Sequence, residues 1–174
     1  MENDHLLDEK KYSLPPMVGD ISAGKITWKR MDEIDYELLG YFLACHLMVE
    51  HYMDEYLKTT HPGLDWDSAK PTFAQRTALL GNLQIEDQFN CIPTIKYMNG
   101  LRNKISHRID HKLDANSLLP LAQFITKMSE GRMEIGEPRD TIDMFAMLCC
   151  SFFAGNISRE VRKTNHTRPA TSRP

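Results

Sequence analysis

The segment "LRNKISHRID", residues 101–110, brings together side chains that are suited to handling phosphate. Arg102 offers a permanently charged, planar set of donors for phosphate oxygens, and the imidazole of His107 exchanges protons near neutral pH. Asn103 can donate to a phosphate oxygen or orient the imidazole without changing the net charge. These residue types fit cleavage of an RNA phosphodiester, with His107 as acid or base. We expect no metal ion and no cofactor in this chemistry.

The element that positions these side chains is expected to be an amphipathic helix opened by Pro93. Its apolar positions recur every three or four residues at Ile95, Met98, Leu101, Ile105 and Ile109. On such a helix Asn103 and His107 share a face, whereas Arg102 is offset from His107 by about 140°. The long Arg102 side chain must therefore reach round the helix towards His107, and fraying after His107 would ease that approach.

Cations extend the polar face of this expected helix. Residues 96–112 hold five Lys or Arg and one acid, which gives a local charge of +4. Because the net charge of the whole chain is −3, the remaining residues together carry −7. We expect Lys104, Arg108, His111 and Lys112 to follow an RNA backbone. An equally weighted alternative is that these cations complement the dipole at the C-terminal end of the helix.

General acid and general base catalysis are two tasks, and the segment supplies one histidine for them. A two-fold dimer presents the same surface twice, so the two copies of His107 could face one cleft. We therefore expect a homodimer with a composite site at its interface.

The order Arg102, Asn103, three further residues and His107 resembles the signature of the HEPN superfamily (higher eukaryotes and prokaryotes nucleotide-binding domain). The resemblance implies a small all-α bundle in which a long helix precedes the motif-bearing helix. It also implies a metal-independent, dimeric endoribonuclease that cleaves single-stranded RNA. Such proteins often act as toxins or defence effectors, and some are paired with an antitoxin; other members only bind.

A second polar pattern lies on the expected first helix, where His46, Glu50 and Asp54 recur every four residues. Such a stripe could hold a metal ion or orient His107, but it is more often a set of ordinary contacts between helices. We expect Glu50 to be an auxiliary residue whose carboxylate faces the basic helix and holds Arg102 or His107.

The hydrophobic pattern predicts an all-α, HEPN-like bundle of about five helices. The two longest are expected to be antiparallel, and Leu47 and Met48 are assigned to the apolar face of the first. No strand is predicted. The expected helices cover residues 31–59, 71–81, the segment from 93, 118–128 and 138–162.

Three regions follow from the composition: an N-terminal arm with little regular structure (1–27), the helical domain (28–163) and a disordered basic tail (164–174). The polar N-terminus and the absence of a long uninterrupted apolar run indicate a cytoplasmic protein with no membrane contact. Four cysteines without metal-ligand spacing are expected to be reduced thiols.

An alternative from a different class remains open. The densely apolar stretch within 138–162 could bind a partner protein, which would make the chain a non-catalytic helical interaction module, such as a regulator or an antitoxin-type subunit. This alternative predicts complex formation without turnover of RNA.

Overall fold

A computed structural model describes residues 15–30, 34–83, 85–108 and 110–166. The chain forms two compact units, Met1–Tyr36 and Glu37–Pro174. The first unit contains strands β1 (Met17–Ser22) and β2 (Lys25–Lys29). The second contains helices α1 (Tyr36–Thr60, which begins at the boundary residue), α2 (Trp66–Ala69), α3 (Phe73–Leu79), α4 (Ile92–His107), α5 (Leu119–Met128) and α6 (Pro138–His166), with short 3-10 turns at Leu80–Asn82 and Asp87–Phe89.

The N-terminal arm is not irregular where it is described, because β1 and β2 pair as an antiparallel hairpin. Ala23 and Gly24 connect the strands, and both have positive φ angles, the backbone geometry that tight hairpins require. The hairpin also runs through the expected boundary between residues 27 and 28. The all-α prediction is therefore wrong for this segment: glycine and proline suggested an irregular arm, whereas β-branched residues such as Val18, Ile21 and Ile26 favour strands.

A bulge gives the hairpin one wholly apolar face. Val18 pairs with Trp28 and Ile21 with Ile26, and the register shifts between the two pairs. Because cross-strand partners lie on the same face, this shift brings Val18 and Ile21 onto one side although they are three residues apart. All four side chains are at least 48% exposed within the described residues.

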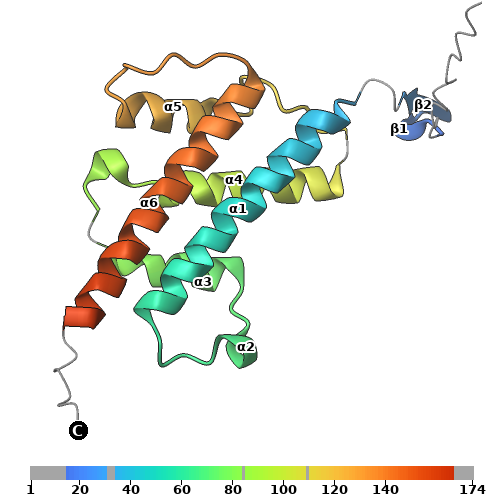
Figure 1. Cartoon of the computed structure of the whole chain (residues 1–174). Coiled ribbons are helices and arrows are strands. Elements are labelled where there is room, and N and C mark those ends of the chain that lie inside the picture. Colours follow the sequence, from blue (N-terminus) through green and yellow to red (C-terminus); the bar gives the residue numbers. More distant parts are fainter. Residues whose placement is uncertain (1–14, 31–33, 84, 109, 167–174) are drawn as a thin grey trace, which may run out of the picture. The chain divides into compact units, whose positions relative to one another are not determined.

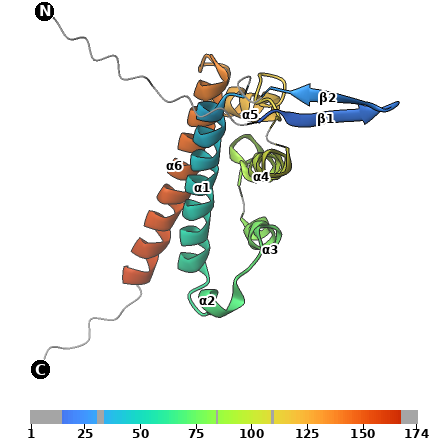
Figure 2. The same ribbon diagram turned by 90° about the vertical axis from the view of Figure 1, so that its right-hand side faces the viewer.

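Two layers make up the helical unit: α1 and α6 run side by side, and α3, α4 and α5 lie across them (Figures 1 and 2). Tyr41, near the start of α1, donates a hydrogen bond to Asp143 near the start of α6. Farther along, the rings of Tyr56 and Phe153 lie 5.8 Å apart. The two longest helices are therefore parallel, which corrects the antiparallel prediction. The intervening elements carry the chain back to the end at which α1 began.

The helical core fills the space between these layers, as the periodic apolar pattern predicted. Its largest fully buried side chains include Phe42, Met53 and Leu57 of α1, Met98 and Leu101 of α4, Leu121 and Ile125 of α5, and Phe145 and Phe153 of α6. Leu47 and Met48, assigned to the apolar face, are instead 62% and 51% exposed. Cys45 and His46 occupy the buried side of that turn.

By length and composition, α6 is the one helix among the described residues that could cross a membrane. This length and composition differ from the expectation that the segment was too short or too interrupted to span. Four of its apolar side chains, Ile142, Phe145, Cys149 and Phe153, are fully buried in the core, which is compatible with a soluble protein. The four cysteines are free thiols. Residues 164–166, assigned to the tail, belong to α6, and the rest of the tail lies outside the described residues.

Candidate functional site

Helix α4 presents the three predicted catalytic residues on its exposed side. Pro93 lies in its first turn, as predicted. The helix buries Ile95, Met98, Leu101 and Ile105, while Arg102, Asn103 and His107 are exposed. It ends at His107, because Arg108 has a non-helical backbone with φ −143°. His107 is therefore the last residue of the helix, and it is exposed. Ile109, expected on the same helix, lies outside the described residues.

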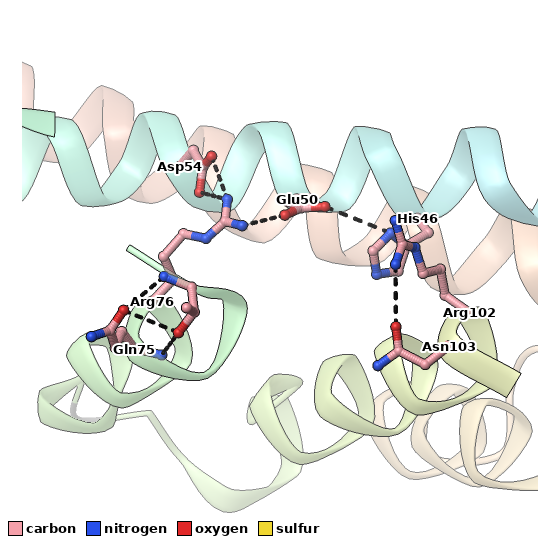
Figure 3. Close-up of polar contacts among 8 residues, drawn as sticks. His46, Glu50, Asp54, Gln75, Arg76, Arg102 and Asn103 are labelled. Atoms are coloured by element: carbon pink, nitrogen blue, oxygen red, sulfur yellow. Dashed lines mark hydrogen bonds and ion pairs between the residues drawn. The ribbon is translucent and has the colours of Figure 1, made fainter. Parts of the chain in front are cut away.

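Arg102 contacts Asn103 and reaches towards α1. Its Nη1 donates a hydrogen bond to Asn103 Oδ1 at 3.2 Å, and its guanidinium lies near the His46 ring (Figure 3). Within the described part of the chain, no carboxylate pairs with Arg102. Its charge is therefore available to an anion from solution. Asn103 accepts this hydrogen bond from Arg102. The expected contact of Asn103 with the imidazole of His107 is not made among the described residues.

The four residues predicted to bind RNA differ in exposure. Lys104, Arg108 and Lys112 are exposed. The Nε atom of Arg108 lies 3.9 Å from Asp110 Oδ1, and 73% of the Arg108 side chain is exposed. This ion pair therefore contributes little stability and leaves the cation accessible. His111 is half-buried, and among the described residues its Nε2 atom has no hydrogen-bond partner. The surface around the motif is thus cationic, but His111 is only partly accessible.

Glu50 does not make the contact expected from the sequence. Its carboxylate pairs with Arg76 of α3, which also binds both carboxylate oxygens of Asp54 at 2.8 and 2.7 Å (Figure 3). Since Arg76 engages both carboxylates of the stripe, Glu50 and Asp54, neither pairs with Arg102 or His107 in the described residues. The stripe on α1 is therefore mainly a contact between helices.

Arg76 is the residue of this network that the sequence did not reveal. Its side chain is 16% exposed, and those of Glu50 and Asp54 are 24% and 29% exposed. The segment around it gives only a short helical signal, which does not say that its one cation faces α1. A capping box between Thr72 and Gln75 fixes the start of α3 and so helps to place Arg76.

His46 lies at the end of the same network and is only 4% exposed. Its Nδ1 atom is 3.8 Å from Glu50 Oε2, and its ring stacks on Phe73 with 6.0 Å between centroids. Burial lowers the pKa of the imidazole from its ordinary value; Glu50 opposes this shift, and the nearby Arg102 and Arg76 lower the pKa further. His46 is therefore neutral at pH 7.

The lowered pKa of His46 makes the stability of the fold depend on pH. The unfolded chain protonates this histidine near its ordinary pKa of about 6.5, while the folded state resists protonation. Unfolding free energy should thus be insensitive to this group above that pH and should fall as the pH is lowered through the folded pKa. Urea unfolding of wild-type and His46→Gln proteins between pH 7.5 and 5 measures the difference. Parallel curves for the two proteins would contradict a neutral, buried His46.

No family model matches this chain, and no curated protein and no solved structure is significantly similar to it. The chemistry of the site therefore follows from its own residues and their geometry. In the described residues, no three His, Cys, Asp or Glu side chains gather as ligands for a metal ion. A pocket of about 330 Å³ opens between the Asp87–Phe89 turn, α5 and α6, and it contains none of the predicted catalytic residues.

Proposed function

We propose that this protein is a metal-independent endoribonuclease that cleaves single-stranded RNA with Arg102, Asn103 and His107. The observation that carries this proposal is the state of Arg102: it is an exposed arginine with no carboxylate partner in the described chain, and it lies on the same helix as the exposed His107. By contrast, the carboxylates nearest to it on α1 are occupied by Arg76. An arginine in this state is suited to bind a phosphodiester.

The proposed reaction consumes no co-substrate, because the RNA supplies both the attacking hydroxyl and the leaving group. The ribose 2′-hydroxyl attacks the adjacent phosphorus in line, the bond from phosphorus to the 5′-oxygen breaks, and a 2′,3′-cyclic phosphate remains. His107 removes the proton from the 2′-hydroxyl or returns one to the leaving 5′-oxygen. Arg102 stabilises the extra negative charge on the phosphoryl oxygens, and Asn103 positions Arg102.

A homodimer would complete the site by supplying the second imidazole. The exposure of His107 at the end of α4 is compatible with its facing a second copy. Lys104, Arg108 and Lys112 would bind the flanking RNA backbone. The resemblance to the HEPN superfamily supports the same dimeric arrangement, with a role as a toxin or defence effector held in check by an antitoxin or regulatory protein.

Cleavage of an oligonucleotide tests the reaction class directly. Purified protein should cleave a mixed-sequence single-stranded RNA in the presence of EDTA and leave a cyclic phosphate on the 5′ fragment. The matched control is the same oligonucleotide with 2′-deoxyribose throughout, which lacks the attacking hydroxyl and should remain intact. Cleavage of both strands, or cleavage that EDTA prevents, would contradict the mechanism.

A non-catalytic interaction module is the second candidate, and the apolar face of the hairpin favours it. Val18, Ile21, Ile26 and Trp28 present an uncovered hydrophobic surface, of the kind that often marks a protein interface. The apolar stretch of α6, the other candidate surface, buries Ile142, Phe145, Cys149 and Phe153 in the core. This candidate predicts no RNA turnover and a stoichiometric protein complex that is lost in Trp28→Ser but kept in His107→Ala.

A further inference from the structure

His46 of α1 has a buried ring nitrogen without a hydrogen-bond partner among the described residues. The residue is 4% exposed, and within the described residues its Nε2 atom has no hydrogen-bond partner. The Asn99 side chain is a polar neighbour that raises the pKa of the ring, yet it completes no hydrogen bond to Nε2. A buried polar atom without a partner carries a free-energy penalty, so its retention calls for an explanation.

The other ring nitrogen faces Glu50. Because Nδ1 lies 3.8 Å from Glu50 Oε2, the carboxylate favours the tautomer that carries its hydrogen on Nδ1. In that tautomer Nε2 is an acceptor. Arg102, which has donors only, extends from α4 to the neighbourhood of the same ring (Figure 3).

Glu50 and Asp54 of α1 pair with Arg76 and not with Arg102. This arrangement has a chemical consequence. A carboxylate beside Arg102 would neutralise its charge and compete with phosphate, whereas a neutral imidazole can accept a hydrogen bond and leave the guanidinium fully charged.

We propose that His46 is a positioning residue for Arg102: the unpartnered Nε2 of its neutral imidazole is placed to accept a hydrogen bond from the guanidinium when Arg102 binds a phosphodiester. Arg76, Glu50 and His46 then form one chain of contacts that ends at Arg102. This inference rests on the proposed function for its biological meaning, since it names the residue that prepares the phosphate-binding arginine.

Protonation of His46 should disrupt this arrangement. The charged groups that face its ring are Glu50 from its own helix, Arg76 from α3 and Arg102 from α4. An imidazolium cannot accept a hydrogen bond at Nε2, and its positive charge would repel Arg102. Binding of a phosphodiester through Arg102 should therefore weaken at low pH.

An NMR titration tests the pairing without any RNA. The pKa of the His46 imidazole is measured in wild-type, Arg102→Met and Arg108→Met proteins. Removal of Arg102 takes away a cation that disfavours protonation, so the pKa should rise. The Arg108→Met control replaces an exposed arginine of the same segment, and the pKa should stay unchanged. An unchanged pKa in Arg102→Met would overturn the inference.

Binding of a 2′-O-methyl RNA oligonucleotide, which lacks the attacking hydroxyl, tests the positioning. His46→Leu should lower affinity about tenfold, because the hydrogen bond to a charged group is lost. His46→Gln, which keeps an acceptor, should bind within about twofold of wild type at pH 7 and lose its pH dependence between pH 7 and 5. In an Arg102→Gln background, His46→Leu should have no further effect.

Two outcomes separate the inference from the proposed function. An equal loss of affinity from His46→Leu with and without Arg102 would show that His46 acts elsewhere, and would overturn the positioning role. If the wild-type protein does not bind the oligonucleotide at all, the proposed function is contradicted, and the NMR titration then decides the pairing of His46 with Arg102 by itself. Circular dichroism confirms that each variant is folded.

Discussion

Replacement of His107 by alanine should reduce RNA cleavage by about 10²-fold to 10⁴-fold, the range typical for loss of a general acid or base. Arg102→Ala should lower the rate by about 10²-fold or more, because a donor that stabilises the transition state is removed. Both side chains are exposed, so the helical fold should survive either change. Initial rates on a fluorescent single-stranded RNA in EDTA, with circular dichroism on the same samples, measure the two effects.

The matched control is His51→Ala, which removes another exposed histidine from a helix. Its cleavage rate should equal that of wild type. Arg102→Lys adds a second comparison, because it restores the charge but not the planar fork, and it should recover only part of the activity. Full activity in His107→Ala protein would remove the proposed mechanism.

Replacement of Arg76 by methionine should lower the free energy of unfolding by about 2–3 kcal/mol. The change leaves two partly buried carboxylates, Glu50 and Asp54, facing each other without a cation. The expected loss of stability is smaller than for a fully buried ion pair, because these side chains keep 16–29% of their surface exposed. Urea unfolding at pH 7 measures the loss.

Lys58→Met supplies the matched control for the Arg76 variant. Lys58 pairs with Glu55 at 2.7 Å, but the two side chains are 48% and 44% exposed, so the change should stay within about 0.5 kcal/mol. Neutralising the carboxylates as well, in Arg76→Met/Glu50→Gln/Asp54→Asn, should recover part of the lost stability. An Arg76→Met protein as stable as wild type would show that the network is not a structural element.

Several features of the site followed from local sequence. Apolar residues spaced by three or four positions predicted α4 and the burial of Ile95, Met98, Leu101 and Ile105. The same spacing left Arg102, Asn103 and His107 on the exposed side. These predictions succeeded because the angle between residues on a helix depends only on their separation in the sequence.

Other features depended on partners that are distant in the sequence. Glu50 contacts Arg76, 26 positions away, instead of the basic helix. The parallel course of α1 and α6 follows from the path of the intervening elements, which the periodicity of either helix does not encode. Leu47 and Met48 are exposed although they are apolar. This part of α1 carries apolar residues on every side of the helix, so only packing decides which of them face the core.

The sequence by itself determined where most of the helices lie, which face of α4 carries Arg102, Asn103 and His107, and how strongly that segment is charged. These properties arise from backbone periodicity and residue chemistry within one or two helical turns. Only the tertiary structure decided that Arg76 pairs with Glu50 and Asp54, that His46 is buried near Arg102, and that Arg102 has no carboxylate partner among the described residues. Those outcomes depend on which helices meet, and that is fixed by packing of the whole core rather than by any local pattern.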